Sequence, residues 1–196
     1  MEILQNRLTY SDPGGLTEML LVRMNGFNAD KNNDMVCYEQ FKGRVEYIGS
    51  SDYYRLFFLL EGKICLKGSG FGKYLLFARE FLLLPPGSEI NCAALISSRY
   101  VVLSCNGLET ESNISFMEEL KNIPCQDKPQ SIALPIHEKL GRVLMSFFAY
   151  STDDSHYPAV YDAVLILMRS FYTNEELAAL FRPMFFGLKR YDKMKI

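Results

Sequence analysis

The chain has 196 residues, of which 48% are hydrophobic and 22% are charged, and it contains 14 Phe and 12 Tyr. This composition is typical of a globular protein with one sizeable core, or a core with a small appended subdomain, and it excludes a disordered chain. The formal net charge of -2 excludes a chain that holds nucleic acid by its overall field, because such surfaces are strongly basic.

The N-terminus and the cysteines indicate the compartment. Residues 1–8 show no charged leader followed by an apolar core, and no apolar run reaches membrane-spanning length, so we expect a cytoplasmic protein without membrane contact. Because the cysteines are odd in number, far apart and without a Cys-x-x-Cys pair, we expect reduced, mostly buried thiols rather than disulfides or a zinc site. These five are Cys37, Cys65, Cys92, Cys105 and Cys125.

Short apolar runs between about residues 20 and 107, separated by Gly, Pro, Asn and Asp, predict strands joined by turns. The clearest unit spans 54–67 and predicts two strands that meet in a tight hairpin at Glu61-Gly62, because glycine tolerates positive φ. Several runs are apolar on both faces, which favours a closed or sandwiched sheet. Further strands are predicted over 74–79, 81–84, 89–94 and 99–105.

After Leu108 the apolar period changes from two to 3.6, which predicts helices near 114–122, over 136–148 and from Pro158 onward. Thr173 and Glu176 have the spacing of a capping box, which predicts a fourth helix. Pro183 should kink or end that helix. We therefore divide the chain into a β-domain over 1–110 and a helical subdomain over 111–196.

Two spacings in the first half resemble the paired motifs of cupins. Gly43 and Gly62 fall at the outer glycines of the first motif, and 85–87 supplies the Pro-x-Gly centre of the second. The resemblance implies a mainly β chain, with a cupin-like double-stranded β-helix barrel (jelly roll) followed by a helical subdomain. The ligand positions of the first motif hold Gly49, Ser51 and Arg55, while Arg79, Ile90 and Ala94 replace the Gly, His and Asn of the second. Because an arginine repels a bound cation, we expect no metal.

Nearly the whole chain also resembles the N-terminal sensor domain of AraC-type transcription regulators, a metal-free cupin-like barrel followed by helices. The matching segments are 57–66, 82–87, 164–172 and 175–183. The resemblance implies a regulatory ligand-sensing and dimerisation domain with a small-molecule effector, a homodimer and no cofactor. DNA would be read only by a C-terminal domain with two helix-turn-helix motifs, which this chain lacks.

Charged and aromatic residues near the predicted strands are candidate ligand contacts, because arginine holds carboxylates and tyrosine combines a flat apolar face with a hydroxyl. These candidates are Tyr53, Tyr54, Arg55 and Arg99. The helix after Pro158 is apolar all round and must be covered by a second copy or by the monomer itself. Its candidate dimerisation residues are Val160, Val164, Leu167, Met168 and Phe171. Core packing and surface pairing remain the alternatives for both sets.

Catalysis finds little support in the sequence. No Gly-x-Ser-x-Gly turn occurs, and both histidines, His137 and His156, lie in the helical half, where solvated or capping roles are expected. We therefore predict no catalytic residue. Two alternatives remain open: a stand-alone metal-independent cupin enzyme or small-molecule-binding protein, and a structural dimerisation module whose barrel is filled by its own Phe and Leu side chains.

Overall fold

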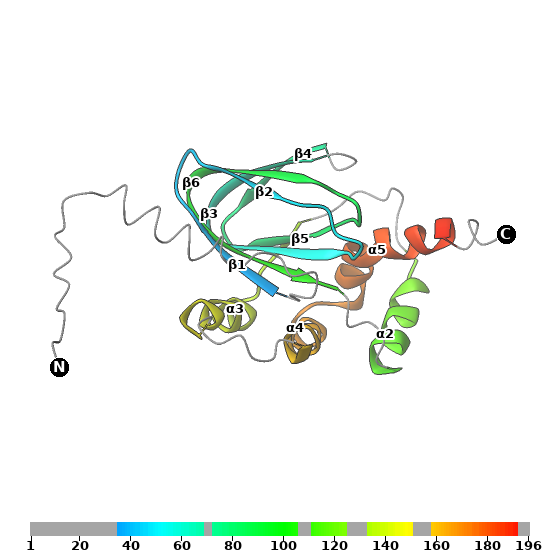
Figure 1. The fold of residues 1–196 in the computed structure, drawn as a ribbon. Helices are drawn as coiled ribbons and strands as arrows, with labels where there is room; N and C mark the ends of the chain where they lie inside the picture. The colour runs from blue at the N-terminus through cyan, green and yellow to red at the C-terminus, as the bar shows by residue number, and fades with distance from the viewer. Residues whose placement is uncertain (1–34, 69–71, 106–110, 125–132, 151–157, 192–196) are drawn as a thin grey trace, which may run out of the picture. The chain divides into compact units, whose positions relative to one another are not determined.

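The computed structural model describes residues 35–68, 72–105, 111–124, 133–150 and 158–191 (Figure 1). The strands are β1 (Met35–Gln40), β2 (Val45–Ile48), β3 (Arg55–Gly68), β4 (Gly72–Phe77), β5 (Glu80–Leu84), β6 (Ile90–Ser104) and β7 (Leu134–Pro135). The helices are α2 (Glu111–Lys121), α3 (Glu138–Tyr150), α4 (Pro158–Phe171) and α5 (Asn174–Tyr191). None of the described helices has both the length and the apolar character that crossing a membrane requires.

All strand pairs are antiparallel, and the two long strands β3 and β6 pair along their whole length. Strands β1 and β2 follow one another along β6, and β5 and β4 follow one another along β3. The sheet is therefore made of two connected layers. In the first layer the order is β1-β6-β3-β5-β7, and in the second it is β2-β6-β3-β4.

A line of irregular positions separates the two layers. The β3–β6 register shifts between Leu59 and Ile64, β1 and β2 are separated by 41–44, and β4 and β5 by 78–79. Three residues on this line have positive φ: Gly43 (81°), Gly62 (97°) and Arg79 (64°). Bulges of this kind bend a strand and increase its twist. The line is therefore where the sheet folds over on itself.

The predicted hairpin at Glu61-Gly62 is wrong, because β3 runs unbroken from Arg55 to Gly68. Gly62 does have positive φ, but it lies in a bulge, where its missing side chain leaves room for Ser98. A bulge and a hairpin both favour glycine, so the local sequence does not distinguish them. The separate strands predicted over 89–94 and 99–105 are likewise halves of the single strand β6.

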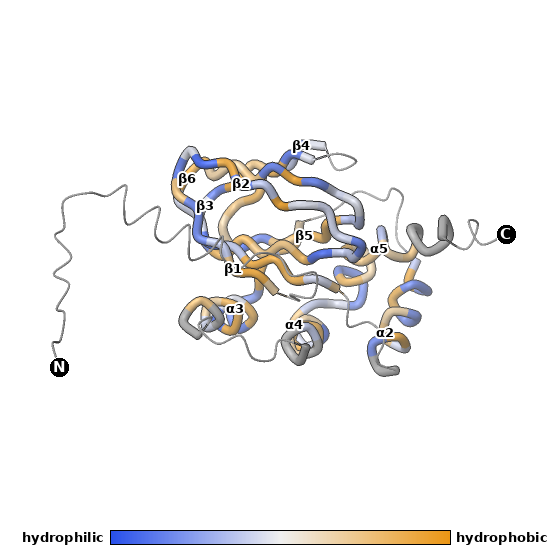
Figure 2. Tube along the Cα trace, viewed as in Figure 1, coloured by the Kyte–Doolittle hydropathy of each residue, from blue (hydrophilic) through white to orange (hydrophobic). Residues whose placement is uncertain are grey.

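Both faces of the first layer are buried, as the apolar runs predicted. One face points between the layers, and its core consists of buried side chains from β2 to β6: Ile48, Phe57, Leu59, Ile64, Leu66, Leu76, Leu82, Leu84, Ile90, Cys92, Tyr100 and Val102. The opposite face meets the helices. The β3 segment 56–60 contributes to both and is hydrophobic throughout (Figure 2).

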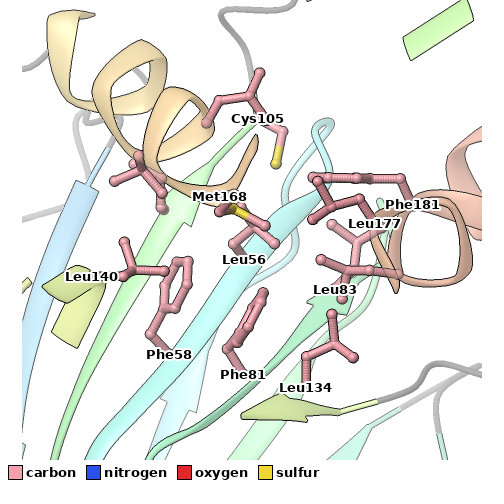
Figure 3. Close-up of a cluster of buried hydrophobic side chains, with 14 of the residues drawn as sticks. Leu56, Phe58, Phe81, Leu83, Cys105, Leu134, Leu140, Met168, Leu177 and Phe181 are labelled. Atoms are coloured by element: carbon pink, nitrogen blue, oxygen red, sulfur yellow. The ribbon is translucent and has the colours of Figure 1, made fainter. Parts of the chain in front are cut away.

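The helix-facing core is built by side chains from β3, β5, β6 and all four described helices. Phe58 and Phe81 stack side by side on adjacent strands, with ring centroids 4.9 Å apart (Figure 3). Leu140 of α3 and Met168 of α4 lie against this face and are fully buried. Strands and helices therefore share one continuous core.

The predicted helices are confirmed, including the capping box that begins α5. The Thr173 N–H donates to Glu176 Oε2 over 2.8 Å, and the Glu176 N–H donates to Thr173 Oγ1 over 3.2 Å. Pro183 lies inside α5 and does not end it. The sequence did not predict β7, which returns from the helical half to pair with β5.

Candidate functional site: the interior of the bent sheet

Arg55 connects the two layers at the end of the sheet that lies opposite the bend. Its side chain points between them, because alternate residues of β3 share one face. Arg55 Nη1 donates to the carbonyl of Gly49 and Nη2 to that of Ser88, each over 2.7 Å. Gly49 follows β2 and Ser88 precedes β6, so both acceptors border the second layer, whereas Arg55 starts β3 in the first. One buried guanidinium therefore fastens the layers together.

The Arg55–Gly49 hydrogen bond joins two of the three positions that correspond to metal ligands in the first cupin motif. Arg55 occupies the third of these positions and donates to Gly49 at the first. The carbonyl of Ser51, at the second, accepts the Gly87 N–H over 2.8 Å. A guanidinium group has donors only, so Arg55 does not bind a cation at the third position. In the described residues no three His, Cys, Asp or Glu side chains are grouped as a metal site would require.

An aromatic stack lies beside this arginine. Tyr38 and Phe57 pack on either side of the Tyr100 ring, with centroids 4.8 Å away in both cases. Glu46 of β2 lies close enough to raise the pKa of Tyr38 further, although burial is the larger cause and Arg55 acts in the opposite direction. Together they raise the pKa of Tyr38 to about 12. Its hydroxyl is therefore protonated at neutral pH and is a hydrogen-bond donor rather than a base.

The ionisation of the two neighbours follows the same physics. Burial raises the pKa of Tyr100 well above its ordinary value, and the adjoining Cys92 thiol contributes in the same direction. Burial lowers the pKa of Arg55, and Tyr38 partly offsets that effect. An arginine nevertheless keeps its charge in proteins. The interior thus combines the cation of Arg55 and the acidic side chain of Glu46 with two neutral phenols.

Two buried polar atoms in this interior have no hydrogen-bond partner among the described residues: Arg55 Nε and Gln40 Oε1. The Gln40 amide nitrogen is satisfied, because it donates to the carbonyls of Arg44 and Cys92 over 2.7 and 2.8 Å. Leaving a buried polar group unpaired costs about 1–3 kcal/mol. Native proteins keep few such groups, and a cluster of them is typical of a place that receives a polar partner.

The structure does not bring the four predicted ligand residues together. Arg55 alone lies between the layers. Tyr53 is 49% exposed, and the Tyr54 hydroxyl donates to the Pro183 carbonyl of α5 over 2.8 Å. Arg99 lies on the outer surface, where it pairs with Glu39 and Glu61 at 2.9 and 3.6 Å. Their role in ligand binding stays a prediction.

The predicted dimerisation residues of α4 divide by burial. Val164 and Met168 are fully buried in the helix-facing core. For these two residues the monomer itself covers the helix, which was the alternative to a dimer interface. Leu167 and Phe171 pack at the edge of that core and keep part of their surface exposed. The side chain of Val160 lies outside the described residues. Ile166, which the sequence analysis omitted, is 61% exposed.

The described histidine has one of the two roles that the sequence predicted. His137 is exposed at the start of α3, where its Nδ1 accepts the Lys139 N–H over 3.3 Å, and its ring stacks on Phe171 at 4.1 Å. His137 is therefore a capping residue, as predicted. The four described cysteines are free thiols. His156 and Cys125 lie outside the described residues.

The local sequence pattern does not single out the polar residues that accompany Arg55: Tyr38, Gln40, Glu46 and Tyr100. Tyr38 and Gln40 are two positions apart and therefore share one face of β1. That spacing was the available signal. It does not reveal which face is internal, because the answer depends on the pairing of β1 with the distant strand β6.

No protein family and no curated protein matches this sequence. Solved structures share short segments with it. A conserved protein of unknown function from Streptococcus pyogenes is 14% identical over 36% of this chain and 60% of its own, with a TM-score of 0.33. The ethanolamine utilization protein Q from Salmonella typhimurium is 19% identical over 37% and 58%, with a TM-score of 0.31.

A third structure, hydroxypropylphosphonic acid epoxidase from S. wedmorenis, is 13% identical over 36% of this chain and 41% of its own, with a TM-score of 0.33. In all three cases the match spans less than two thirds of the other chain. Overlaps this short and distant do not identify a family.

Proposed function

We propose that this chain is a cupin-like regulatory domain of the AraC type that binds a small polar or anionic effector between its two layers and forms a homodimer through its helices. One observation carries the proposal: the buried cation Arg55 has no carboxylate partner among the described residues, and the unpaired Oε1 of Gln40 shares its interior. A carboxylate or phosphate would accept from Arg55 Nε, because guanidinium groups favour such acceptors.

The backbone supports the cupin-like assignment independently of side chains. The two cupin motifs place glycine at four positions, which here are Gly43, Gly62, Arg79 and Gly87. All four have positive φ, with values of 81°, 97°, 64° and 70°. Arg79 keeps the conformation although it is not a glycine. The spacing in the sequence therefore coincides with the turns and bulges that a bent two-layered sheet requires.

A metal-independent enzyme is the second candidate, and Glu46 beside Tyr38 is the observation in its favour. Acid–base catalysis works best when the pKa of the catalytic group is near the working pH. Burial raises the pKa of Tyr38 to about 12 and that of Tyr100 well above its ordinary value. Both phenols are therefore poor bases at neutral pH, and a binding role suits them better.

The exposed apolar side chains of α4 support dimerisation through this helix. Ile166 is 61% exposed, and Leu167 and Phe171 keep part of their apolar surface accessible on the same helix. Substituting Ile166 and Leu167 by Ser should shift a homodimer toward monomer in sedimentation-velocity measurements. Lys42→Ser, at an exposed residue between β1 and β2, is the comparison. An unchanged mass for the Ile166/Leu167 variant would leave the helical interface without support.

Effector binding is tested by thermal unfolding of the chain against a panel of small carboxylates, sugar acids and sugar phosphates. A ligand that binds only the folded state raises Tm as its concentration increases. We expect the response to weaken at least tenfold in apparent affinity in Arg55→Lys and Tyr38→Phe, and to persist in Tyr53→Phe, whose ring lies at the surface. Equal responses in all three variants would place binding elsewhere.

The regulator assignment has a separate test in the source gene. We expect the coding sequence after codon 196 to continue into two helix-turn-helix motifs. A stop codon at that point would remove the regulator assignment and favour a stand-alone binding protein, whereas the effector measurement would keep its meaning.

A further inference from the structure

The outward face of the second layer carries a row of apolar side chains across all four of its strands. Val45 pairs with Ala93, Ala93 with Cys65, and Cys65 with Leu75. Val45 is 62% exposed and Leu75 is 40% exposed at the two ends of this row. No described helix covers this face, because the helices pack on the opposite side of the first layer.

The neighbouring rows add further apolar side chains and lysines. Tyr47, Phe77 and Ile96 are between 47% and 57% exposed. Lys63 pairs with both Phe77 and Ile96, and its Nζ lies 4.7 Å from the centre of the Phe77 ring. We call this surface the lysine-edged face, defined by the apolar residues Val45, Tyr47, Leu75, Phe77 and Ile96 with Lys63, Lys67 and Lys73.

The charges on the lysine-edged face are unbalanced. Lys67 and Lys73 lie directly opposite each other on β3 and β4, an arrangement that destabilises a sheet when both groups carry the same charge. Among the described residues none of the three lysines forms an ion pair. Three acids on the adjoining strands and turns interact with other residues: the Glu80 carboxylate accepts the Phe77 N–H, Glu89 lies beside Tyr47, and Glu61 pairs with Arg99. The face thus pairs exposed apolar surface with uncompensated positive charge.

From this juxtaposition we infer that the lysine-edged face binds an acidic, apolar segment of another protein. Carboxylates of the partner would lie over Lys67 and Lys73 and relieve their mutual repulsion. Apolar side chains of the partner would cover the row from Val45 to Leu75. Patches of contiguous apolar surface with a polar edge are typical of protein interaction sites, and complementary charge selects the partner and its orientation.

Two other occupants fit the charges less well. A second copy of the chain would bring its own lysines against Lys63, Lys67 and Lys73, which adds repulsion instead of removing it. An anionic membrane is recognised by clusters of about four to eight basic residues. This face has three lysines, all on the adjacent strands β3 and β4.

The test uses the full 196-residue chain as bait for a phage-displayed library of random 12-residue peptides. We expect the enriched peptides to combine Asp or Glu with apolar residues. A selected peptide should bind at least tenfold more weakly to Lys67→Glu/Lys73→Glu and to Val45→Ser/Leu75→Ser, and its binding should weaken as salt increases. Lys121→Glu/Lys139→Glu, at exposed residues of α2 and α3, is the matched charge control and should bind like the unchanged chain.

Three results would overturn the inference. The first is the absence of any peptide enriched over selection on the Lys67→Glu/Lys73→Glu variant. The second is a selected peptide that binds all variants equally. The third is binding to phosphatidylserine vesicles, lost in Lys67→Glu/Lys73→Glu, without peptide enrichment, which would identify a membrane surface. Circular dichroism of each variant ensures that a loss of binding is not a loss of folding.

Discussion

The backbone of Gly62 lies directly against the side chain of Ser98: a methyl group at position 62 would approach Ser98 Oγ to 2.1 Å. Ser98 Oγ also accepts the Lys63 N–H over 3.2 Å and donates to the Ile96 carbonyl over 2.7 Å. These contacts hold Ser98 in place, so it has little freedom to move away. The bulge that folds the sheet therefore depends on the absence of a side chain at one position.

Gly62→Ala should destabilise the chain by about 3 kcal/mol or more, because the new methyl group clashes with fixed atoms and takes up an unfavourable φ. Gly43→Ala is the matched control. Gly43 also has positive φ, but no atom lies within 4 Å of the position that its Cβ would occupy. Only the backbone cost of about 1 kcal/mol applies there. Urea unfolding of both variants measures the difference, and equal losses would contradict the steric account.

Arg79→Gly should stabilise the chain. Arg79 has a φ of 64°, and a left-handed conformation costs a non-glycine residue about 1–2 kcal/mol. Glycine removes this cost and returns about 0.5–1 kcal/mol as added freedom of the unfolded chain. The expected net gain is about 0.5 kcal/mol. Arg79→Ala, which keeps the strain, should leave the free energy of unfolding nearly unchanged, and a gain equal to that of glycine would assign the effect to the lost side chain.

Thr173→Ala should lower the free energy of unfolding by about 1 kcal/mol, because the backbone N–H of Glu176 loses its acceptor at the start of α5. Thermal unfolding, followed by circular dichroism, measures this loss. Ser170→Ala, on the exposed side of α4, should change stability by less than about 0.5 kcal/mol. A similar loss in both variants would show that the capping bonds contribute nothing specific.

The chain should lose stability at alkaline pH. Burial raises the pKa of Cys37, Cys92 and Cys105 from 9.0 to about 12, so the folded state retains protons that the unfolded state releases above pH 9. The stabilisation is complete below pH 9 and is lost as pH rises toward 12. Urea unfolding between pH 8 and 11 should show this decline, and it should be shallower in Cys105→Ala. A free energy of unfolding that stays constant over this pH range would contradict the raised pKa of the buried thiols.

The sequence predicts most of what local patterns determine. Helix periodicity and the Thr173–Glu176 spacing are local, and the structure confirms both. The bulge at Gly62 and the unbroken β6 depend on pairing between distant strands, which local patterns do not encode. Arg55 was predicted as a candidate ligand contact because arginine holds carboxylates. Its neighbours Tyr38 and Glu46 were not, because they come from strands brought together only by the fold.

The order of pairing has a consequence for synthesis on the ribosome. Strand β1 has its partners in the second half of β6, so the first strand of the sheet must wait for residues near Leu103 before it can pair. The helices that cover the first layer follow later still. Such long sequence separations slow folding and leave apolar surface exposed while the chain is incomplete. The nascent chain therefore keeps the helix-facing side of the first layer exposed until α4 and α5 have emerged.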